Sequence, residues 1–159
     1  MSTSLRAIEF LGLSLWLGSD VFLSFVVAPG AFRILGGRDQ AGALVGYSLK
    51  VMHVGGIACG LVLLAARLLR TKTFASLATP AALCVVLMIA LTAISQYTVS
   101  AKMAAVRLQM GSIQATAADS PLLAEFTRLH SISVSLESGV LLAGIAAVYW
   151  MVREIAAKT

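Results

Sequence analysis

The sequence predicts an all-α membrane protein, built as a bundle of four transmembrane helices in a single domain that covers residues 1–159. Hydrophobic residues make up 59% of the chain, charged residues only 12%, and the mean hydropathy is +0.93. This balance is far from that of a soluble domain. Four apolar segments, each about as long as the ~20 residues that cross a bilayer, fill most of the chain.

The four helices are expected at about residues 5–28, 40–69, 75–108 and 121–156. Pro29 is expected to end or kink the first helix, because proline removes a backbone donor and crowds the preceding turn. Thr79 and Pro80 are expected to cap and begin a helical segment, or to kink it. Ser120 and Pro121 have the same pattern, and predict the start of the fourth helix. The third helix is expected to project beyond the membrane.

Small residues four positions apart indicate sites where membrane helices approach closely. Three such pairs occur, Ser14 with Gly18, Gly42 with Gly46 and Gly56 with Gly60. Cys59 and Cys84 lie inside apolar runs without CxxC spacing, so we interpret them as small core residues rather than as a disulfide or redox pair.

The formal charge of +5 does not indicate nucleic-acid binding. Lys and Arg lie mostly at helix ends and in short connections, where cations anchor membrane helices, and no basic face is interleaved with aromatic residues. Four crossings place both termini on one side of the membrane. The cations that clearly flank the helices favour the cytoplasm as that side.

Ionisable residues interrupt three of the four apolar segments at a similar depth. Asp20, Lys50, His53 and Glu137 lie 14 to 17 residues from the arginine that anchors each helix, which is about 21–26 Å into a hydrocarbon core of about 30 Å. A lone ion at such depth costs about 2.5–3.5 kcal/mol, so these groups are expected to face inward. One carboxylate would pair with Lys50, and the other would be protonated, hydrogen-bonded or neutralised by a cation.

These residues predict a polar pocket that opens toward the external face. Glu137 follows His130 by seven residues, which places both on one helix face. Asp20, Lys50, His53 and Glu137 would form the floor, with Arg128 and His130 at the mouth. Further candidates for the lining are Trp16, Tyr47, Met88, Gln96, Tyr97 and Ser133.

Three functions stay open from the residues alone. The pocket could bind a proton, a small cation or a polar ligand without catalysis. Alternatively, the chain is a homo-oligomer or an accessory subunit of a membrane complex, and the polar layer is purely structural. The third possibility is a haem-linked redox protein. Ligation of one haem by both His53 and His130 is disfavoured because their levels differ by about 13 Å, whereas ligation by a single histidine stays open.

Three stretches carry a resemblance to a known family: WLGSDVFLSFVVAPGAFRIL, AGALVGYSL and FTRLHSISVSLESGVLL. They resemble the bacterial branch of the transmembrane-protein-205-like family, whose members usually have Asn at the position of Glu137. The best motif is F-x-x-L-H-x-x-S-V, which begins at Phe126. The architecture is also similar to that of copper-resistance-D-type membrane proteins. The resemblance implies a four-helix fold in the bacterial inner membrane, but no biochemical activity.

Overall fold

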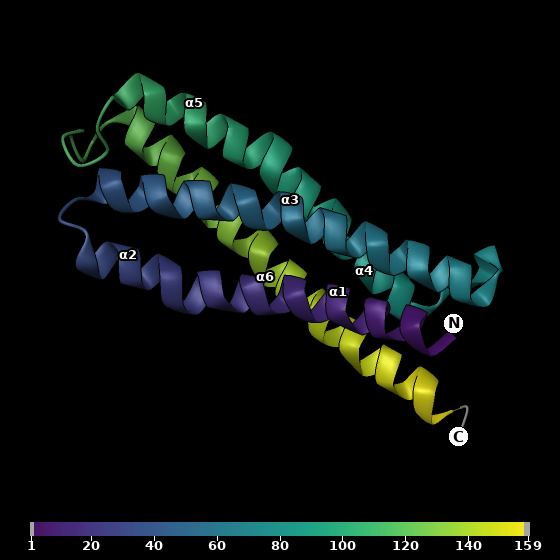
Figure 1. Ribbon diagram of the computed structural model, residues 1–159. Helices are drawn as coiled ribbons and strands as arrows, with labels where there is room; N and C mark the ends of the chain where they lie inside the picture. The colour runs from purple at the N-terminus through teal and green to yellow at the C-terminus, as the bar shows by residue number, and fades with distance from the viewer. Residues whose placement is uncertain (1, 158–159) are drawn as a thin grey trace.

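The computed structural model describes residues 2–157, and every regular element in this part of the chain is helical. The helices form four long rods that run side by side (Figure 1). Each rod is long and apolar enough to cross a membrane, and the four spans are Thr3–Ile34, Arg38–Thr71, Pro80–Met110 and Pro121–Ala156. The predicted all-α fold with four membrane-spanning helices is therefore confirmed.

The first rod consists of α1 (Ser2–Phe22), a π-helical segment η1 (Leu23–Val27) and α2 (Ala28–Ile34). Pro29, which was expected to end or kink the first helix, does not end this rod but lies in the first turn of α2, directly after the π-helical segment. A proline ring crowds the carbonyl group of the preceding turn. Because that turn is π-helical and therefore wider, the rod continues through Pro29 to Ile34.

The second and fourth rods are single helices, α3 (Arg38–Thr71) and α6 (Pro121–Ala156). Ser120 occupies the N-cap position of α6 and Pro121 its first turn, as predicted, although the Ser120 side chain makes no capping hydrogen bond. At the end of α3, Lys72 adopts a left-handed conformation with φ of 57°. Its backbone N–H donates to the carbonyl oxygen of Leu68 and so terminates the helix.

The third rod is interrupted more than the sequence pattern suggested. It is preceded by a 3₁₀ turn η2 (Phe74–Ala78), and consists of α4 (Pro80–Ile94), a π-helical segment η3 (Ser95–Ser100) and α5 (Ala101–Met110). Pro80 is in the first turn of α4, so the membrane-spanning helix begins there rather than at residue 75.

Both chain termini and the connection from α3 to α4 lie at one end of the bundle, which we call the terminal end (Figure 1). The turn from α2 to α3 and the loop from α5 to α6 lie at the opposite end, the loop end. Along the bundle α1 packs against α3, and α4 packs against α6. At the loop end no Cα atoms within 8 Å of each other join α2 to α6 or α3 to α5 among the described residues. The bundle therefore opens toward the loop end.

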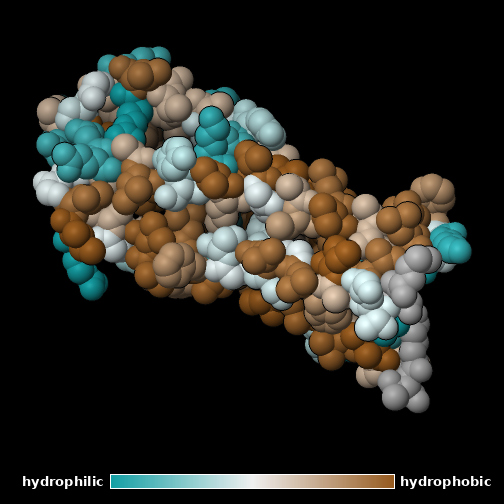
Figure 2. Space-filling view, viewed as in Figure 1, coloured by the Kyte–Doolittle hydropathy of each residue, from teal (hydrophilic) through white to brown (hydrophobic). Residues whose placement is uncertain are grey.

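The interior of the bundle between its two ends is an apolar core. Its largest fully buried side chains include Leu13, Trp16, Leu63 and Met88. Large apolar side chains also cover the outside, and Phe25, for example, is 65% exposed. Figure 2 shows this apolar surface along the rods and a more hydrophilic surface near the loop end. An apolar exterior of this extent fits rods that face lipid.

Only one of the three predicted pairs of small residues makes a close contact within the chain. The indole of Trp16 lies on Gly56 and Gly60, and a Cβ atom added at Gly60 would lie 2.7 Å from its ring. A Cβ atom at Gly56 would be closer still to the indole nitrogen of Trp16. By contrast, Gly18 and Gly46 have no atom within 4 Å of the position of an added Cβ. The glycines of α3 thus make room for an aromatic ring.

The substitution Gly56→Ala is expected to destabilise the bundle. Its methyl group would occupy the place of the Trp16 indole, and overpacking of this kind costs about 1–3 kcal/mol. Gly46→Ala is the matched control on the same helix, and is expected to be neutral or slightly stabilising because alanine favours helix. Denaturant unfolding in detergent micelles, followed by circular dichroism, measures both. Equal stability of the two variants would contradict the assigned role of Gly56.

Candidate functional site

A buried histidine forms the centre of the polar layer. His53 on α3 is 0% exposed, and both nitrogen atoms of its ring have partners. Nδ1 lies 2.9 Å from Oε1 of Gln96, which belongs to η3, and Nε2 lies 2.7 Å from Oε1 of Glu137 on α6. An amide oxygen can only accept a hydrogen bond, so Nδ1 carries a proton in this arrangement. The hydrogen bonds of His53 therefore join three of the four rods.

The carboxylate of Glu137 has one satisfied oxygen and one unsatisfied oxygen. Ser95 in η3 donates a hydrogen bond of 3.0 Å to Oε1, the same atom that contacts His53. Oε2 is buried and has no hydrogen-bond partner among the described residues. The side chain of Glu137 as a whole is 13% exposed. The structure thus places this predicted site residue beside a histidine.

The first rod supplies a second carboxylate at this level. Asp20 on α1 is 1% exposed, and its charge interacts with those of Glu137 and His53. Ser24 donates a hydrogen bond of 3.3 Å to Oδ1, while Oδ2 is buried without a partner. We call the side chains of Asp20, His53, Ser95, Gln96 and Glu137 the acid–histidine centre. All four rods contribute to it.

The two π-helical segments lie beside this centre. Ser95 and Gln96 are the first residues of η3, and Ser24, the partner of Asp20, belongs to η1. A π-helical turn holds an extra residue and so changes which side chains face the interior, and such turns are frequent at functional sites. Here the two segments place hydroxyl and amide groups within reach of charged side chains.

Two more buried polar atoms without partners lie about one helical turn closer to the terminal end. Trp16 precedes Asp20 by four residues, and its indole Nε1–H has no acceptor among the described residues. Thr92 precedes Ser95 by three residues, and its hydroxyl oxygen is likewise unpartnered. Beyond these groups the interior becomes the apolar core. The polar region is therefore shallow and faces the loop end.

The structure places several of the other predicted residues in the interior. Met88 is 0% exposed and belongs to the apolar core, as does Trp16. Ser133 is buried about one helical turn from Glu137, toward the loop end. Among the predicted lining residues, Gln96 has the most specific contact, because it fixes the proton on Nδ1 of His53.

Lys50 is not part of the site, and the expected ion pair between Lys50 and a carboxylate does not form within residues 2–157. Lys50 is exposed, although it lies within one helical turn of His53. The long lysine side chain can carry its ammonium group away from an apolar interior toward the nearest polar region. The shorter imidazole of His53 stays inside, and is the basic group that contacts Glu137.

The expected mouth of the pocket is also not assembled as predicted. Arg128 and His130 are exposed, and Tyr47 and Tyr97 are 69% and 68% exposed on the outside of the bundle. His130 shares a helix face with Glu137, but at its level α2 no longer contacts α6. The face of α6 that packs against other helices at Glu137 is therefore exposed at His130.

The donor set does not fit a haem iron or a metal cluster in this arrangement. Neither ring nitrogen of His53 is free for ligation, because both are engaged by side chains. The other histidine, His130, is exposed. Among the described residues, no group of three or more histidine, cysteine, aspartate or glutamate side chains could hold a metal ion.

A second group of buried charges lies at the terminal end. Arg67 on α3 is 3% exposed, and its Nη2 donates to both carboxylate oxygens of Glu154 at 2.6 Å. The same nitrogen donates to the hydroxyl of Thr79 at 2.7 Å, and Nε donates to the carbonyl oxygen of Ser76 at 3.0 Å. Arg67 thus binds α3 to α6 and to the start of α4.

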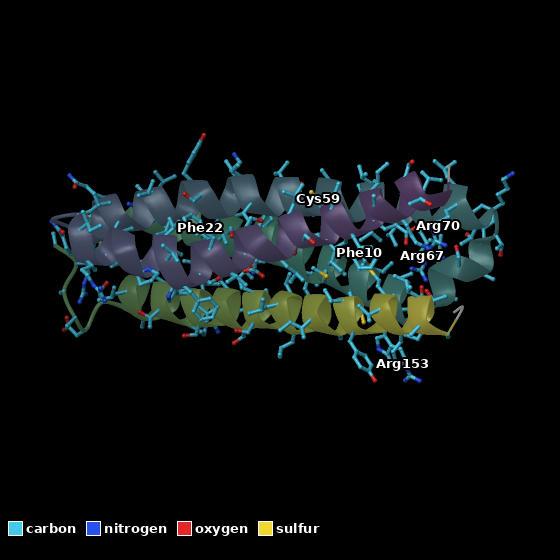
Figure 3. All side chains as sticks on the ribbon, turned by 60° about the horizontal axis from the view of Figure 1, so that its bottom comes forward. Phe10, Phe22, Cys59, Arg67, Arg70 and Arg153 are labelled. Atoms are coloured by element: carbon cyan, nitrogen blue, oxygen red, sulfur yellow. The ribbon has the colours of Figure 1, made fainter. Side chains whose placement is uncertain are left out.

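Glu9 joins the first rod to this group. It is 1% exposed and accepts two hydrogen bonds from Arg70, of 2.5 Å and 3.1 Å, while Nη1 of Arg67 lies 3.6 Å from its Oε2. Arg67 and Arg70 lie together at the terminal end, whereas Arg153 lies toward the other side of the bundle there (Figure 3). We call Glu9, Arg67, Arg70 and Glu154 the terminal-end charge cluster. It ties the four rods together opposite the acid–histidine centre.

Sequence reasoning missed Glu9, Ser95 and Thr92. Glu9 follows Arg6 by three residues near the start of the first apolar run, so it was indistinguishable from a polar flank. Ser95 was detectable in principle, because Thr92, Ser95 and Gln96 share a helix face by their spacing.

The fold and the site together define a class of protein: a multi-pass, all-helical membrane protein with a buried acid–histidine centre. The family model described as "Domain of unknown function (DUF4149)" matches residues 11–112, from α1 into the loop after α5. This match covers more than half of the chain, so the protein belongs to that family. No curated protein and no solved structure matches the chain.

Removal of the Arg67 charge is expected to destabilise the bundle strongly. In Arg67→Gln, the buried carboxylate of Glu9 and the carboxylate of Glu154, which is 30% exposed, lose their shared partner. Breaking a buried pair costs about 3–5 kcal/mol, and the lower value is expected here because Glu154 is partly exposed. Arg153→Gln is the control, because Arg153 is exposed and its guanidinium group, among the described residues, contacts only the rings of Tyr149 and Trp150. It should cost about 1 kcal/mol or less. Unfolding in detergent measures both variants, and similar losses would contradict the distinction.

Proposed function

We propose that this is a non-enzymatic membrane protein that binds and exchanges a proton at its acid–histidine centre. The observation that carries the proposal is the presence of two buried carboxylates, Asp20 and Glu137, beside a single basic group, His53. Each carboxylate has one oxygen without a partner among the described residues. One acid is therefore in excess, and its charge has no matching cation in the centre.

The protons of the centre can be counted from the hydrogen bonds. Nδ1–H of His53 donates to Gln96, and a second proton lies in the contact between Nε2 and Glu137. Whether this second proton belongs to the imidazole or to the carboxyl group, the pair of His53 and Glu137 has no net charge. The hydroxyl of Ser95 also donates to Oε1 of Glu137, which favours the ionised carboxylate with a protonated imidazole.

Asp20 then decides the net charge of the centre. When it is ionised, the centre has a charge of −1 at membrane depth, and a buried charge of this kind costs about 2.5–3.5 kcal/mol. Protonation of Asp20 removes the charge. A proton needs only one carboxylate oxygen, and Oδ2 of Asp20 is available as the acceptor. We therefore propose Asp20 as the residue that takes up and releases the proton.

The membrane and the orientation of the protein in it are part of the same proposal. We propose that the protein lies in the bacterial inner membrane with both termini in the cytoplasm, which is consistent with the position of the termini at one end of the bundle (Figure 1). The acid–histidine centre would then lie nearer the external face. The resemblance of the sequence to the bacterial transmembrane-protein-205-like family supports this location, and remains part of the proposal.

Infrared difference spectroscopy of the reconstituted protein tests the proton count. At neutral pH the wild type should show the band of one protonated carboxyl group that exchanges with deuterium. Asp20→Asn should lose this band, because the remaining pair of His53 and Glu137 needs no further proton. His53→Gln should show a larger band, because two acids then face each other without a base.

Glu125→Gln is the matched control for this experiment. Glu125 is an exposed acid on the same helix as Glu137, so its loss should leave the buried band unchanged. Circular dichroism of each variant checks that the helices remain folded. A band in Asp20→Asn that is as strong as in the wild type would refute the assignment of the proton to Asp20.

A second candidate function is a subunit of a homo-oligomer, favoured by the open surroundings of Gly46. This glycine has no atom of its own chain within 4 Å of an added Cβ, so the face of α3 around it is free for a second helix. Gly46→Cys should then form a crosslinked dimer in native membranes under mild oxidation, whereas Gly56→Cys, beneath Trp16, should not. Absence of the dimer in Gly46→Cys would exclude this contact.

A further inference from the structure

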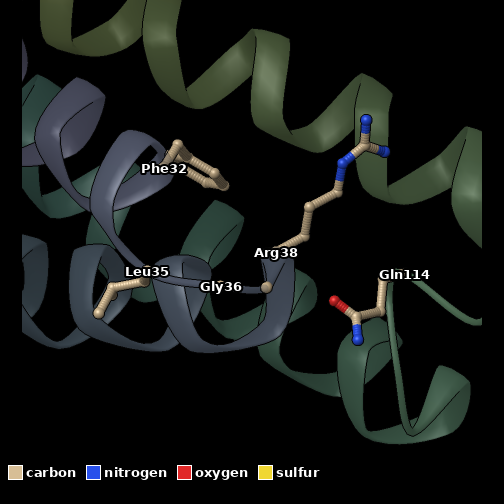
Figure 4. A pocket seen from close by; sticks show the side chains of 6 residues that line it. Phe32, Leu35, Gly36, Arg38 and Gln114 are labelled. Atoms are coloured by element: carbon tan, nitrogen blue, oxygen red, sulfur yellow. The ribbon is translucent and has the colours of Figure 1, made fainter.

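A cavity lies at the loop end, remote from the acid–histidine centre. Its volume is about 380 Å³, and it is bordered by Phe32, Leu35, Gly36, Gly37, Arg38 and Gln114. Figure 4 shows the side chains of Phe32, Arg38 and Gln114 around it. The cavity thus lies between the turn that joins α2 to α3 and the loop that joins α5 to α6.

The two walls of this cavity are held together by hydrogen bonds. Asp39, the residue after Arg38, accepts hydrogen bonds from the hydroxyl of Ser112 at 2.6 Å and from the backbone N–H of Ile113 at 2.8 Å. Arg107 donates to the carbonyl oxygen of Asp39. The loop comes so close that a Cβ atom at Gly37 would lie 2.8 Å from Oε1 of Gln114. The cavity is therefore a built feature of the loop end.

The polar groups that border the cavity are suited to an anion. The guanidinium group of Arg38 and the side-chain amide of Gln114 have no hydrogen bond or ion pair with the described residues. Asp39, the nearest acid along the chain, already has its carboxylate occupied by Ser112 and Ile113. Arginine forms paired, charge-assisted hydrogen bonds with phosphate oxygens, and an amide N–H adds a further donor.

The apolar border of the cavity indicates where this anion comes from. Phe32 is part of the lining and is 54% exposed, and Ile34 beside it is 82% exposed. Both belong to α2, the last part of a rod that is long and apolar enough to span the membrane. Exposed side chains of this kind are favourable where they meet lipid chains. The cavity thus has cationic and apolar walls side by side at the membrane surface.

We propose that this cavity binds the phosphate group of one phospholipid, with Arg38 and Gln114 as ligands and with the acyl chains along Phe32 and Leu35. The occupant is a lipid from the leaflet at the loop end. The site is independent of the proton proposed at Asp20, because it shares no residue with the acid–histidine centre.

Native mass spectrometry of the full chain, released from detergent micelles, tests the site with dioleoylphosphatidylglycerol as the probe. The wild type should retain one lipid molecule. Arg38→Gln should bind roughly ten-fold more weakly, because a charge-assisted pair with the phosphate is lost. Arg33→Gln is the matched control, since Arg33 is an exposed cation that directly follows the lining residue Phe32 but does not itself border the cavity. It should bind as the wild type does.

Two further comparisons identify the source of the phosphate. Dioleoylglycerol, which has the same acyl chains without the phosphate, should not be retained, and millimolar inorganic phosphate should not displace the lipid. Gln114→Ala should weaken retention less than Arg38→Gln does. Equal retention by Arg38→Gln and Arg33→Gln, retention of dioleoylglycerol, or displacement by inorganic phosphate would each overturn the proposal.

Discussion

Two carboxylates near a single imidazole, in the interior of a membrane bundle, constrain most of this structure. Neither acid can face lipid without a large cost in free energy, so each must lie inside and find a donor. His53 meets this requirement only because η3 supplies Gln96 and Ser95 at the same level. The packing of α1 along α3 and of α4 along α6 brings these groups together. The position of one polar layer thus depends on the register of all four rods.

The sequence predicted the fold well, and predicted the ionisable residues of the site and Gln96, but not Ser95. Composition and the length of the apolar segments were sufficient for four membrane-spanning helices, because these quantities average over many residues. Asp20, His53 and Glu137 were expected at one depth because the rise per residue of a helix is fixed. The contacts between them could not be expected. They depend on the rotation of each rod about its axis. This rotation changes at the π-helical segments, which no local sequence pattern predicted.

The errors at Lys50 and His130 have a common physical cause. Both residues were assigned to the predicted pocket from their depth and helix face. Neither criterion shows how many other helices pack against that face. Near His130, α6 still packs against α5 but has no contact with α2 among the described residues, so His130 is exposed rather than covered by another helix. At Lys50 the length of the side chain matters as well, because its four methylene groups allow the ammonium group to lie at a different depth from the backbone. Depth alone therefore predicts too many pocket residues where the helices of a bundle are farther apart.

The apolar core between the two charged groups has a consequence for the direction in which the protein could respond. Glu9 and Asp20 are on the same rod, 11 residues or about 16 Å apart, and the interior between them includes Leu13, Leu63 and Met88. These apolar side chains cannot hold a chain of hydrogen-bonded water molecules. The ion-paired Arg67 and Arg70 close the terminal end. A proton at Asp20 would therefore equilibrate with a single compartment. If Asp20 exchanges the proton as we propose, the molecule would respond to acidity on one side of the membrane rather than conduct protons between two aqueous phases.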